Sequence, residues 1–415
     1  MHFNIRLRSV LGLFGFLLIF LAFVFPRNYG EAKLAILLIS IMIIISGILS
    51  GKLKIKSQNV FGFFSVYMLL NAVAAINGYL QGNEIAAILD GVRLGVLFPL
   101  IIGLLWLAML SFEYEKYFHR VVIASGVVIS FLVIGTVVGS FIGVDFFSDE
   151  FRKDNLLIVG IHDGYTQVIA HNIGSLFFII GYILYFIVSG EGWIGRKKQL
   201  ILIAGVILIA VLMSGRRALM ILTNLSPLLL LLNWYLFADN KNTIKNIFAI
   251  AVFFFAIFAA FTGYLFINNY FDLDAFIERV AGVFSDDGGA RVAQADLLFK
   301  AFTQQPILGS GFGGTIDLVR SQERPWIFEL TYLQMLFNFG LIGFLGMALI
   351  FFYQYKKIHR KATNNFPFSP VEKSMVCGFT FLLLGAISNP YFGSFDFLLT
   401  IGVLPFLASK NRRIQ

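Results

Sequence analysis

The chain has 415 residues, of which 58% are hydrophobic and only 13% are charged, and its mean hydropathy is +0.84. A soluble domain carries about 25% charged residues, so this composition excludes one soluble core and makes the bilayer the solvent for most of the chain. A net charge of +9 would suggest nucleic acid for a soluble protein, but basic residues in membrane loops explain it better, and we expect no nucleic-acid partner.

Twelve apolar segments have roughly the 17–25 residues that a membrane-spanning helix needs. Arg6 and Arg8 precede the first segment, and no small-residue cleavage pattern follows it, which indicates an uncleaved span rather than a signal peptide. Pro99 predicts a kink in the fourth segment. The twelve predicted spans are 9–25, 34–50, 59–79, 93–111, 121–144, 168–188, 199–213, 218–237, 246–267, 329–353, 372–389 and 394–409.

These spans predict an all-α integral membrane protein of three parts. Nine spans form a membrane domain over residues 1–267, a long loop covers 268–328, and three more spans occupy 329–415. With both termini in the cytoplasm, the inner connections hold 20 of the 32 lysines and arginines, as the positive-inside rule requires. The long loop and the shorter segment 145–167 then lie on the outer side.

The long loop contains one expected helix. Asp286 through Gly289 form a start signal for it and Pro306 a stop signal. This helix would lie on the membrane surface or pack over the bundle, and Gly309 through Gly314 would form a flexible turn after it. Residues 290–304 have helical spacing, and five apolar side chains can share one face: Val292, Leu297, Leu298, Ala301 and Phe302.

Arg216 and Arg217 lie at the outer end of a tight hairpin between two apolar segments, against the charge bias. A guanidinium at that depth needs an anion or a carbonyl group as its partner, and its planar fork matches pairs of phosphate oxygens. An interfacial arginine that reaches lipid headgroups is the alternative. Ser214 and Gly215 favour a ligand site, because they let the backbone turn sharply and come close to a ligand.

Two further charged residues border the long loop. Arg291 lies near the start of the expected loop helix, and by spacing alone a salt bridge with Asp287 or Asp296 is favoured over ligand binding. Glu329 opens the tenth span, where a carboxylate in the first turn gains a few tenths to ~1 kcal/mol from the helix dipole. The other interpretation of Glu329 is a general base at the bilayer edge, tuned by partial burial and nearby arginine.

His171 and Asn172 open the sixth span on the same outer side, where a lone histidine is more often a hydrogen-bonded interface residue than a catalyst. Asp90 and Arg93 predict an i,i+3 pair at the outer end of the fourth span. The sequence has no Asp-rich magnesium motif, Walker loop or serine nucleophile elbow. Its single cysteine, Cys377, excludes a disulfide framework. We therefore expect neither a cofactor nor a metal.

Three stretches follow one another around the long loop. They are Leu212 to Ala218, then Arg291 to Pro306 with Leu308 to Gly313, and then Glu329 to Gly343. In this order and spacing they resemble the O-antigen ligase and polymerase superfamily of bacterial inner membranes. That family has a Ser-Arg-Gly/Ala hairpin, an arginine with an amphipathic helix, proline and Gly-x-Gly, and His-Asn-x-x-Leu with Gly-x-x-Gly after the loop. Outside residues 212–343 only the span count and loop placement match.

The resemblance implies a glycosyltransferase of the GT-C type that acts on polyprenyl-pyrophosphate-linked glycans at the periplasmic face. By that analogy Arg216 and Arg291 hold the pyrophosphate, and Glu329 activates the acceptor hydroxyl. The substrate-binding residues that we expect around them are Arg217, His171, Asn172, Tyr332 and Gly311.

The ligases of this family carry histidine at the position of Glu329, so the glutamate favours a Wzy-type polymerase. Such an enzyme joins undecaprenyl-pyrophosphate-linked repeat units into O-antigen or a related surface polysaccharide. The reaction would be inverting and metal-independent, and a chain-length-regulating membrane protein would be a further partner. A ligase that transfers the glycan to lipid A-core is the alternative with the same chemistry. A twelve-span secondary transporter is the alternative from another class, but its ionisable groups belong near the midplane, whereas here the candidate charges crowd one face.

Overall fold

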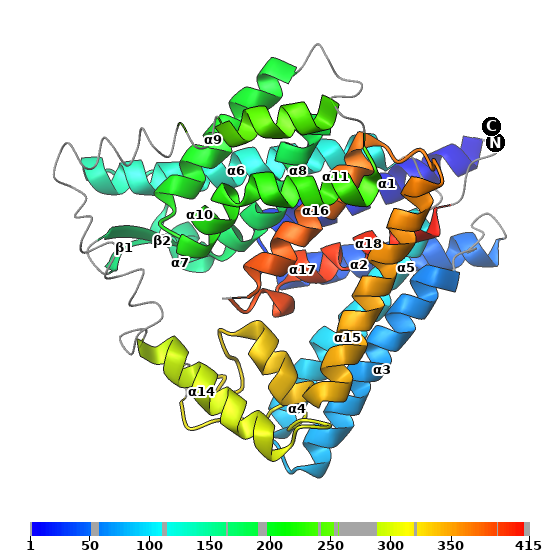
Figure 1. Ribbon diagram of the computed structural model, residues 1–415, viewed down its shortest axis with the longest axis vertical. Helices are drawn as coiled ribbons and strands as arrows, with labels where there is room; N and C mark the ends of the chain where they lie inside the picture. Colours follow the sequence, from blue (N-terminus) through cyan, green and yellow to red (C-terminus); the bar gives the residue numbers. More distant parts are fainter. Residues whose placement is uncertain are drawn as a thin grey trace.

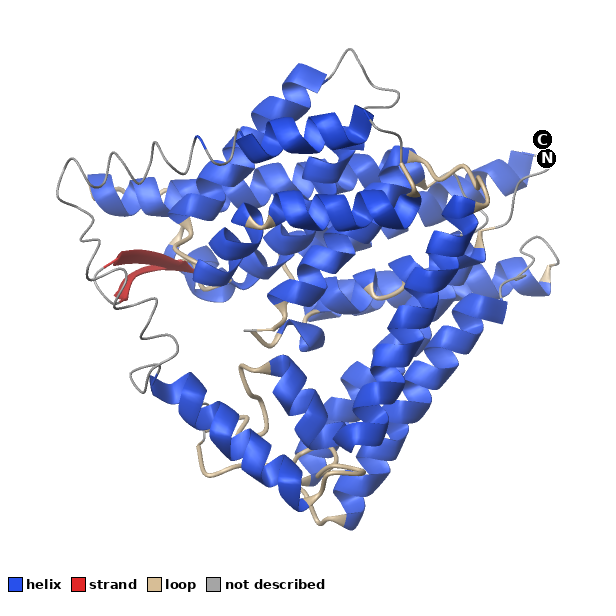
Figure 2. Cartoon of the chain, viewed as in Figure 1, coloured by secondary structure: helices blue, strands red, loops and turns tan. Residues whose placement is uncertain are grey.

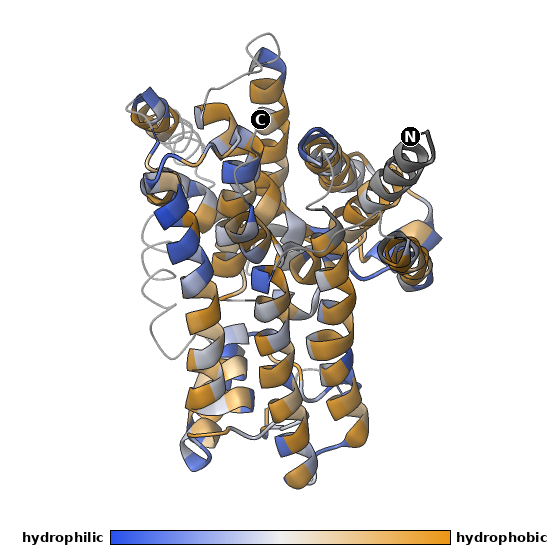
Figure 3. Ribbon diagram, turned by 90° about the vertical axis from the view of Figure 1, so that its right-hand side faces the viewer, coloured by the Kyte–Doolittle hydropathy of each residue, from blue (hydrophilic) through white to orange (hydrophobic). Residues whose placement is uncertain are grey.

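The computed structural model of the protein is mostly helical, with long helices at several inclinations and one small hairpin (Figures 1 and 2). The residues that the structure describes are 2–50, 58–109, 114–162, 165–189, 197–239, 242–252, 256, 289–318, 322–387 and 389–410. Apolar residues run along the long helices, and hydrophilic residues gather near their ends (Figure 3). This distribution agrees with a protein embedded in a membrane.

The elements keep the labels of Figure 1. In the first half of the chain they are α1 (His2–Val24), α2 (Gly30–Leu49), α3 (Gln58–Leu80), α4 (Ile85–Val92), the π-helix η1 (Arg93–Leu97), α5 (Phe98–Met109), α6 (Glu115–Ile142), α7 (Asp149–Asn155), β1 (Ile158–His162), β2 (Tyr165–Ile169), the 3₁₀ helix η2 (His171–Gly174) and α8 (Ser175–Ser189). In the second half they are α9 (Lys197–Met213), α10 (Arg217–Asn224), α11 (Ser226–Phe237), α14 (Gly289–Gln304), α15 (Thr331–Thr363), α16 (Pro370–Gly385), the 3₁₀ helix η5 (Tyr391–Gly393), α17 (Phe395–Thr400) and α18 (Val403–Ser409).

Six helical segments of the described chain are long and apolar enough to cross a membrane, and α10 with α11, bent by 56° between them, would make a seventh. Three shorter apolar helices, Leu13–Val24, Lys198–Met213 and Phe395–Ser409, accompany them. Each predicted span coincides largely with helix, although the sixth begins in β2 and the fourth, ninth and eleventh include residues outside the described ranges. The structure thus supports a membrane protein but does not confirm twelve full spans. The six segments are Gly30–Gly47, Gln58–Leu80, Ile85–Leu107, Glu115–Ile142, His171–Ser189 and Thr331–Thr363.

One small β-hairpin accompanies the helices. In the segment predicted as the shorter outer loop, α7 is followed by an antiparallel hairpin in which Ile158 pairs with Ile169 and His162 with Tyr165. Val168 also donates its backbone N–H to the carbonyl of Ser214, 3.0 Å away. The hairpin therefore packs on the α9–α10 turn.

α8 is the central helix, since 94% of its span is buried, against 33% for α3 and α15. Its main neighbour is α16, and glycines let the two helices approach closely. A Cβ at Gly181 would lie 2.6 Å from the Phe381 ring, and one at Gly378 would lie 2.6 Å from the Phe178 carbonyl oxygen. No larger side chain fits this interface without moving the helices apart.

The helix ends that the sequence places in the cytoplasm contact one another through buried polar groups. Tyr114, at the start of α6, donates a hydrogen bond of 2.7 Å to Glu372 in the first turn of α16. Lys410, just after α18, pairs with the same carboxylate. Lys373 pairs with Asp239 beyond the end of α11. These contacts place the ends of four helices at one level.

Pro99 alters the helix locally, but Ile85–Leu107 remains one span, so the predicted kink stays a prediction. Proline has no N–H to donate to the carbonyl four residues earlier, and directly before it the chain forms the π-helix η1, in which the Phe98 N–H bonds to the Arg93 carbonyl. The predicted pair of Asp90 and Arg93 is also present.

The prediction of one continuous helix after the long loop is wrong at Gly340. This residue has φ 61° and ψ −171°, which only glycine adopts readily, so α15 consists of two segments, 331–339 and 341–363. The segment Pro306–Gly314 fills the break. Ser310 and Gly311 donate their N–H groups to the carbonyls of Phe337 and Asn338, at 2.8 and 3.0 Å.

The same segment also contacts α3, so it is held on two sides and is not a free turn. Asn77 and Asn83 donate side-chain hydrogen bonds to the carbonyls of Gly309 and Phe312, at 2.7 and 2.9 Å. Gly311 has φ +72°, and a Cβ there would lie 2.1 Å from the backbone nitrogen of Gly78. Its role in the structure is therefore close packing against α3.

We expect Gly311→Ala to lower the free energy of unfolding by about 1–3 kcal/mol, the usual cost of forcing atoms into a packed interface. The measurement is the thermal unfolding midpoint of the purified protein in detergent. Gly205→Ala is the matched control, because nothing lies within 4 Å of a Cβ at that helical position. Equal midpoints for the two variants would contradict the packing role.

Candidate active site

An ion pair at the start of α15 joins Arg291, in the long loop, to Glu329, at the end of that loop. Arg291 Nε, in the first turn of α14, lies 2.5 Å from Glu329 Oε2. The Glu329 side chain is 12% exposed, whereas that of Arg291 is 54% exposed. The sequence expectation that these residues meet at one place is therefore confirmed, and the pair joins a nearly buried carboxylate to an accessible guanidinium.

A buried glutamine fixes the backbone beside this pair. Gln294, one turn after Arg291, accepts the N–H groups of Glu329 and Leu330 on its side-chain oxygen, at 2.9 and 3.4 Å. One turn further, Leu298 packs against Phe328 and Phe337 in a small apolar cluster. The predicted loop helix thus forms, and it packs on α15 through Leu298, while Val292 of its expected apolar face is exposed.

Of the two pairings that spacing favoured for Arg291, the one with Asp296 is not formed, because Asp296 pairs with Lys300, and the one with Asp287 lies outside the described residues. α15 begins at Thr331 with no acidic residue in its first turn. Glu329 therefore lies just before the helix and not in its first turn, and Gln294 accepts its backbone N–H.

The α9–α10 hairpin places Arg216 with its side chain turned into the protein. Gly215 has φ +65°, which allows the tight turn, and Ser214 is fully buried and accepts the Arg216 N–H on its hydroxyl at 3.3 Å. Arg216 Nε is buried and has no hydrogen-bond partner among the described residues. A buried unpaired donor is costly, so this position calls for an acceptor. Arg217, the first residue of α10, is exposed.

Tyr391, in the connection between α16 and α17, lies within electrostatic range of three arginines. Burial raises the pKa of its phenol to about 12; the positive charges of Arg216, Arg27 and Arg291 act to lower that pKa, and the carboxylate of Asp396 acts to raise it. These arginines belong to three separate parts of the chain, and the fold brings all three parts within range of one phenol. In Figure 1, α10 and α17 lie above α14, with the golden first part of α15 between them.

Hydrogen bonds join the start of α15 to the connection that carries Tyr391. Thr331 donates its hydroxyl to the carbonyl of Asn389 at 2.7 Å. Tyr332 donates its hydroxyl to the carbonyl of Leu383 at 2.8 Å, and its ring meets Phe392 edge-on, with centroids 5.3 Å apart. Tyr332 is thus placed beside the site, but its hydroxyl is used in a structural contact.

His171 and Asn172 occupy η2, beside the same connection, because a Cβ at Gly174 would lie 2.7 Å from the Tyr391 ring. Asn172 is buried and donates to the carbonyl of Val24 at 3.2 Å, while its side-chain oxygen is buried without a partner among the described residues. The structure therefore gathers Arg216, Arg291, Glu329, Tyr332, His171 and Asn172 around one region. Gly311 belongs to the segment that packs on α3 instead.

Sequence reasoning missed Arg27 and Tyr391. Arg27 lies in the α1–α2 connection and is exposed, and the neighbouring Asn28 bonds to Asn155 of α7 at 3.0 Å. Arg27 lies in a connection that is expected on the outer side, where the positive-inside rule predicts few basic residues. Arg216 departs from the rule in the same way. Tyr391 had no such signal, because one tyrosine after an Asn-Pro turn resembles any interfacial aromatic residue.

Two buried charged residues, Lys33 and Asp396, lie nearby. Asp396, the second residue of α17, accepts a hydrogen bond of 2.8 Å from Ser175, and Lys33 in the first turn of α2 lies over the Phe395 ring at 5.2 Å. Both charged residues are almost fully buried. Because they sit at helix ends on the side of Tyr391, they extend the polar region inward without reaching the middle of a span.

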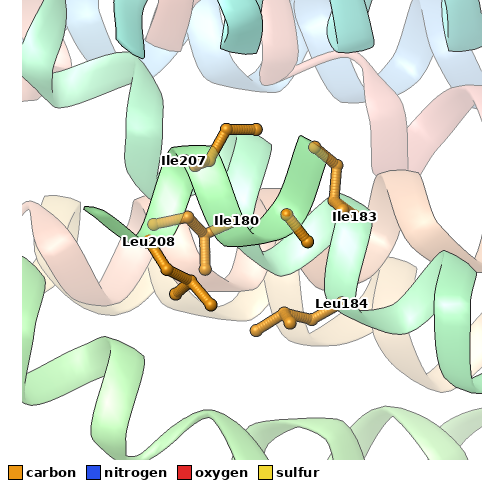
Figure 4. A pocket seen from close by; sticks show the side chains of 6 residues that line it. Ile180, Ile183, Leu184, Ile207 and Leu208 are labelled. Atoms are coloured by element: carbon orange, nitrogen blue, oxygen red, sulfur yellow. The ribbon is translucent and has the colours of Figure 1, made fainter. Parts of the chain in front are cut away.

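Other parts of the described chain offer little for chemistry. The small void between α8 and α9 in Figure 4 has only about 10 Å³ and is lined by six apolar side chains, including Ile180 and Ile207. It suits packing and not a sugar or a cofactor. Within the described ranges, no three His, Cys, Asp or Glu side chains gather as a metal site would require.

Comparison with known proteins gave no relative: no family model, curated protein or solved structure matches the chain. Function is therefore inferred from the geometry around Tyr391 and Glu329 and from the motif resemblance.

Proposed function

We propose that the protein is a glycosyltransferase of the GT-C type that polymerises undecaprenyl-pyrophosphate-linked repeat units into O-antigen or a related surface polysaccharide. The observation that carries this proposal is the ion pair of Glu329 with Arg291, together with the electrostatic influence of Arg216, Arg27 and Arg291 on Tyr391. Several arginines suit a pyrophosphate, whose oxygens accept bidentate guanidinium contacts. One carboxylate beside them suits the activation of a hydroxyl.

In the proposed reaction, the growing glycan on undecaprenyl pyrophosphate is the donor and a lipid-linked repeat unit is the acceptor. Glu329 takes the proton of the acceptor hydroxyl as its oxygen attacks the anomeric carbon. The bond from that carbon to the pyrophosphate oxygen breaks, and its electron pair leaves with the pyrophosphate. Arg216 and Arg291 stabilise the charge that develops there, an electrostatic contribution that is often the largest in catalysis. In-line attack inverts the anomeric configuration.

The proposed location is the bacterial inner membrane, with both termini in the cytoplasm and the site facing the periplasm. The lipid-linked glycans and the bilayer are the immediate partners, and a chain-length-regulating membrane protein is a further one. This orientation is supported by the distribution of lysine and arginine, which concentrates positive charge at the opposite helix ends.

Deletion of the gene in its host tests the proposal through the banding of cell-surface glycan. A lost polymerase leaves lipid A-core capped with a single repeat unit. A lost ligase instead leaves uncapped core with accumulating polymer. Unchanged banding would contradict both activities.

We predict that activity on purified lipid-linked repeat units persists in excess EDTA. The proposed site uses guanidinium groups where other phosphate-handling enzymes use Mg²⁺, which needs a compact set of oxygen ligands. The measurement is polymer length and rate with and without chelator. Loss of activity that only Mg²⁺ or Mn²⁺ restores would refute this prediction.

A secondary transporter is the second candidate, and three observations favour it: the bend between α10 and α11, the break at Gly340 and the buried charged residues Lys33 and Asp396. Transporters use broken helices and ionisable groups near the midplane. Here Lys33 and Asp396 lie within the first turns of their helices. Uptake of labelled repeat-unit sugars into vesicles, without polymer formation, would favour transport over transfer.

A further inference from the structure

A groove between α3 and α15 lies at the end of the membrane domain away from Tyr391. Its volume is about 490 Å³. Each wall covers nine residues, about 12 Å of helix at 1.5 Å per residue. The lining residues are Gln58, Asn59, Gly62, Phe63 and Val66 of α3, and Leu349, Ile350, Tyr353, Gln354 and Lys357 of α15.

The groove changes from polar to apolar along its length. Because α3 and α15 are antiparallel here, Asn59 lies beside Lys357, whereas the other end is lined by Val66 and Leu349. Val66 and Leu349 are exposed, so this end is open to the surrounding hydrocarbon. The order of polar group, then aromatic ring, then aliphatic side chains matches the order of headgroup, glycerol region and acyl chain in a phospholipid.

The polar end is held in a fixed arrangement. Asn59 donates its side-chain amide to Gln354, 2.9 Å away, and to the carbonyl of Pro405, 3.1 Å away, and it accepts a hydrogen bond of 2.9 Å from Lys357 Nζ. An ammonium group has three N–H donors, and Asn59 is the one hydrogen-bond partner of Lys357 within the described ranges. Two donors therefore remain for another molecule.

The charge at this end is positive. Lys357 forms no ion pair among the described residues; Lys356 precedes it on the same helix, and Arg360 and Lys361 follow it. A cation at a membrane boundary attracts an anionic headgroup, whereas a zwitterionic headgroup offers less net attraction. Gly62 faces open space, since nothing lies within 4 Å of a Cβ built there, so the groove has room for an acyl chain beside α3.

We propose that this groove is a binding site for an anionic phospholipid, with its phosphate on Lys357 and its acyl chain between α3 and α15. The inference is independent of the glycosyltransferase proposal, because it uses neither the site around Tyr391 nor any step of the reaction.

Native mass spectrometry of the full-length protein in detergent tests the site. The probes are phosphatidylglycerol and phosphatidylcholine with the same acyl chains, added separately. We expect the first phosphatidylglycerol to bind about fivefold more tightly than phosphatidylcholine, the effect of roughly one lysine near an anionic lipid. Lys357→Gln should remove that preference, whereas the control Lys356→Gln, an exposed neighbour outside the groove lining, should keep it.

A steric variant tests the groove without changing charge. Gly62→Leu should remove the tight first binding step for phosphatidylglycerol, and Gly205→Leu in α9, which also meets nothing within 4 Å, should leave it intact. Size-exclusion profiles establish that each variant is folded. Equal affinity of the wild-type protein for the two lipids would overturn the anionic preference. Binding that survives both Gly62→Leu and Lys357→Gln would overturn the site itself.

Discussion

Glu329→Gln is expected to slow polymer formation by about 10²–10⁴-fold, the usual cost of removing a general base. Glutamine keeps the shape of the side chain and can still accept a hydrogen bond from Arg291, but it cannot take the proton of an acceptor hydroxyl. An ion pair with arginine favours the charged carboxylate, which is the form that a base needs. The measurement is the initial rate of polymer formation on purified lipid-linked repeat units.

A purely structural role for Glu329 predicts a different result. A partly exposed ion pair contributes about 0.2–1 kcal/mol to stability, so its loss would lower the unfolding midpoint slightly and leave the rate nearly intact. Asp296→Asn is the matched control, because it removes the carboxylate of an exposed pair on the same α14 helix. If folded Glu329→Gln protein binds the repeat unit normally and keeps more than roughly a tenth of the rate, Glu329 is not the base. His171 would then be the next residue to test.

Arg216→Lys is expected to lower the polymerisation rate about 10- to 150-fold, although the positive charge is kept. A hydrogen bond to a charged group contributes about 1.5–3 kcal/mol, and lysine cannot reproduce the paired contact of a guanidinium with pyrophosphate oxygens. Lysine also lacks the Nε donor, which in Arg216 is buried without a partner in the described part of the protein. The measurement is the rate at saturating repeat unit, at equal protein level.

Arg217→Lys provides the internal comparison for this substitution. Arg217 is the next residue along the chain and is exposed at the start of α10, so we expect its lysine variant to polymerise at close to the wild-type rate. Wild-type rate and glycan length in Arg216→Lys would remove Arg216 from the pyrophosphate site. A loss in both variants would indicate that the hairpin is sensitive to any change.

The helices of this protein could be predicted because their cause is local. An apolar segment of sufficient length favours a helix in a bilayer wherever it occurs, and the spacing of Leu298 and its neighbours indicated α14 to within one residue of its observed start. The breaks were not predictable in this way. Gly340 sits in a continuous apolar pattern, and its positive φ exists because Ser310 and Gly311 supply hydrogen bonds from a distant part of the chain.

The site residues also divide into those with a local signal in the sequence and those that only the fold brings together. Arg216 and Glu329 stood out because each is a charged residue at the edge of an apolar segment, and the motif resemblance linked them to Arg291 in the long loop. The partner of Arg291 could not be read from spacing, because Glu329 is 38 residues away. Tyr391 could not be found at all, since only the fold brings it within electrostatic range of three remote arginines.

The break at Gly340 has a consequence for how a sugar could reach Glu329. From the break to Lys356, the first lysine of the helix end that the sequence places in the cytoplasm, residues 341–355 make only 15 residues and about 22 Å of helix, less than the roughly 30 Å of bilayer hydrocarbon. Residues 331–339 are therefore needed to complete the crossing, and Glu329, directly before them, can lie at the level of the lipid headgroups. A hydrophilic glycan could then meet this carboxylate while its hydroxyl groups stay hydrated, with only the polyprenyl tail remaining among the acyl chains.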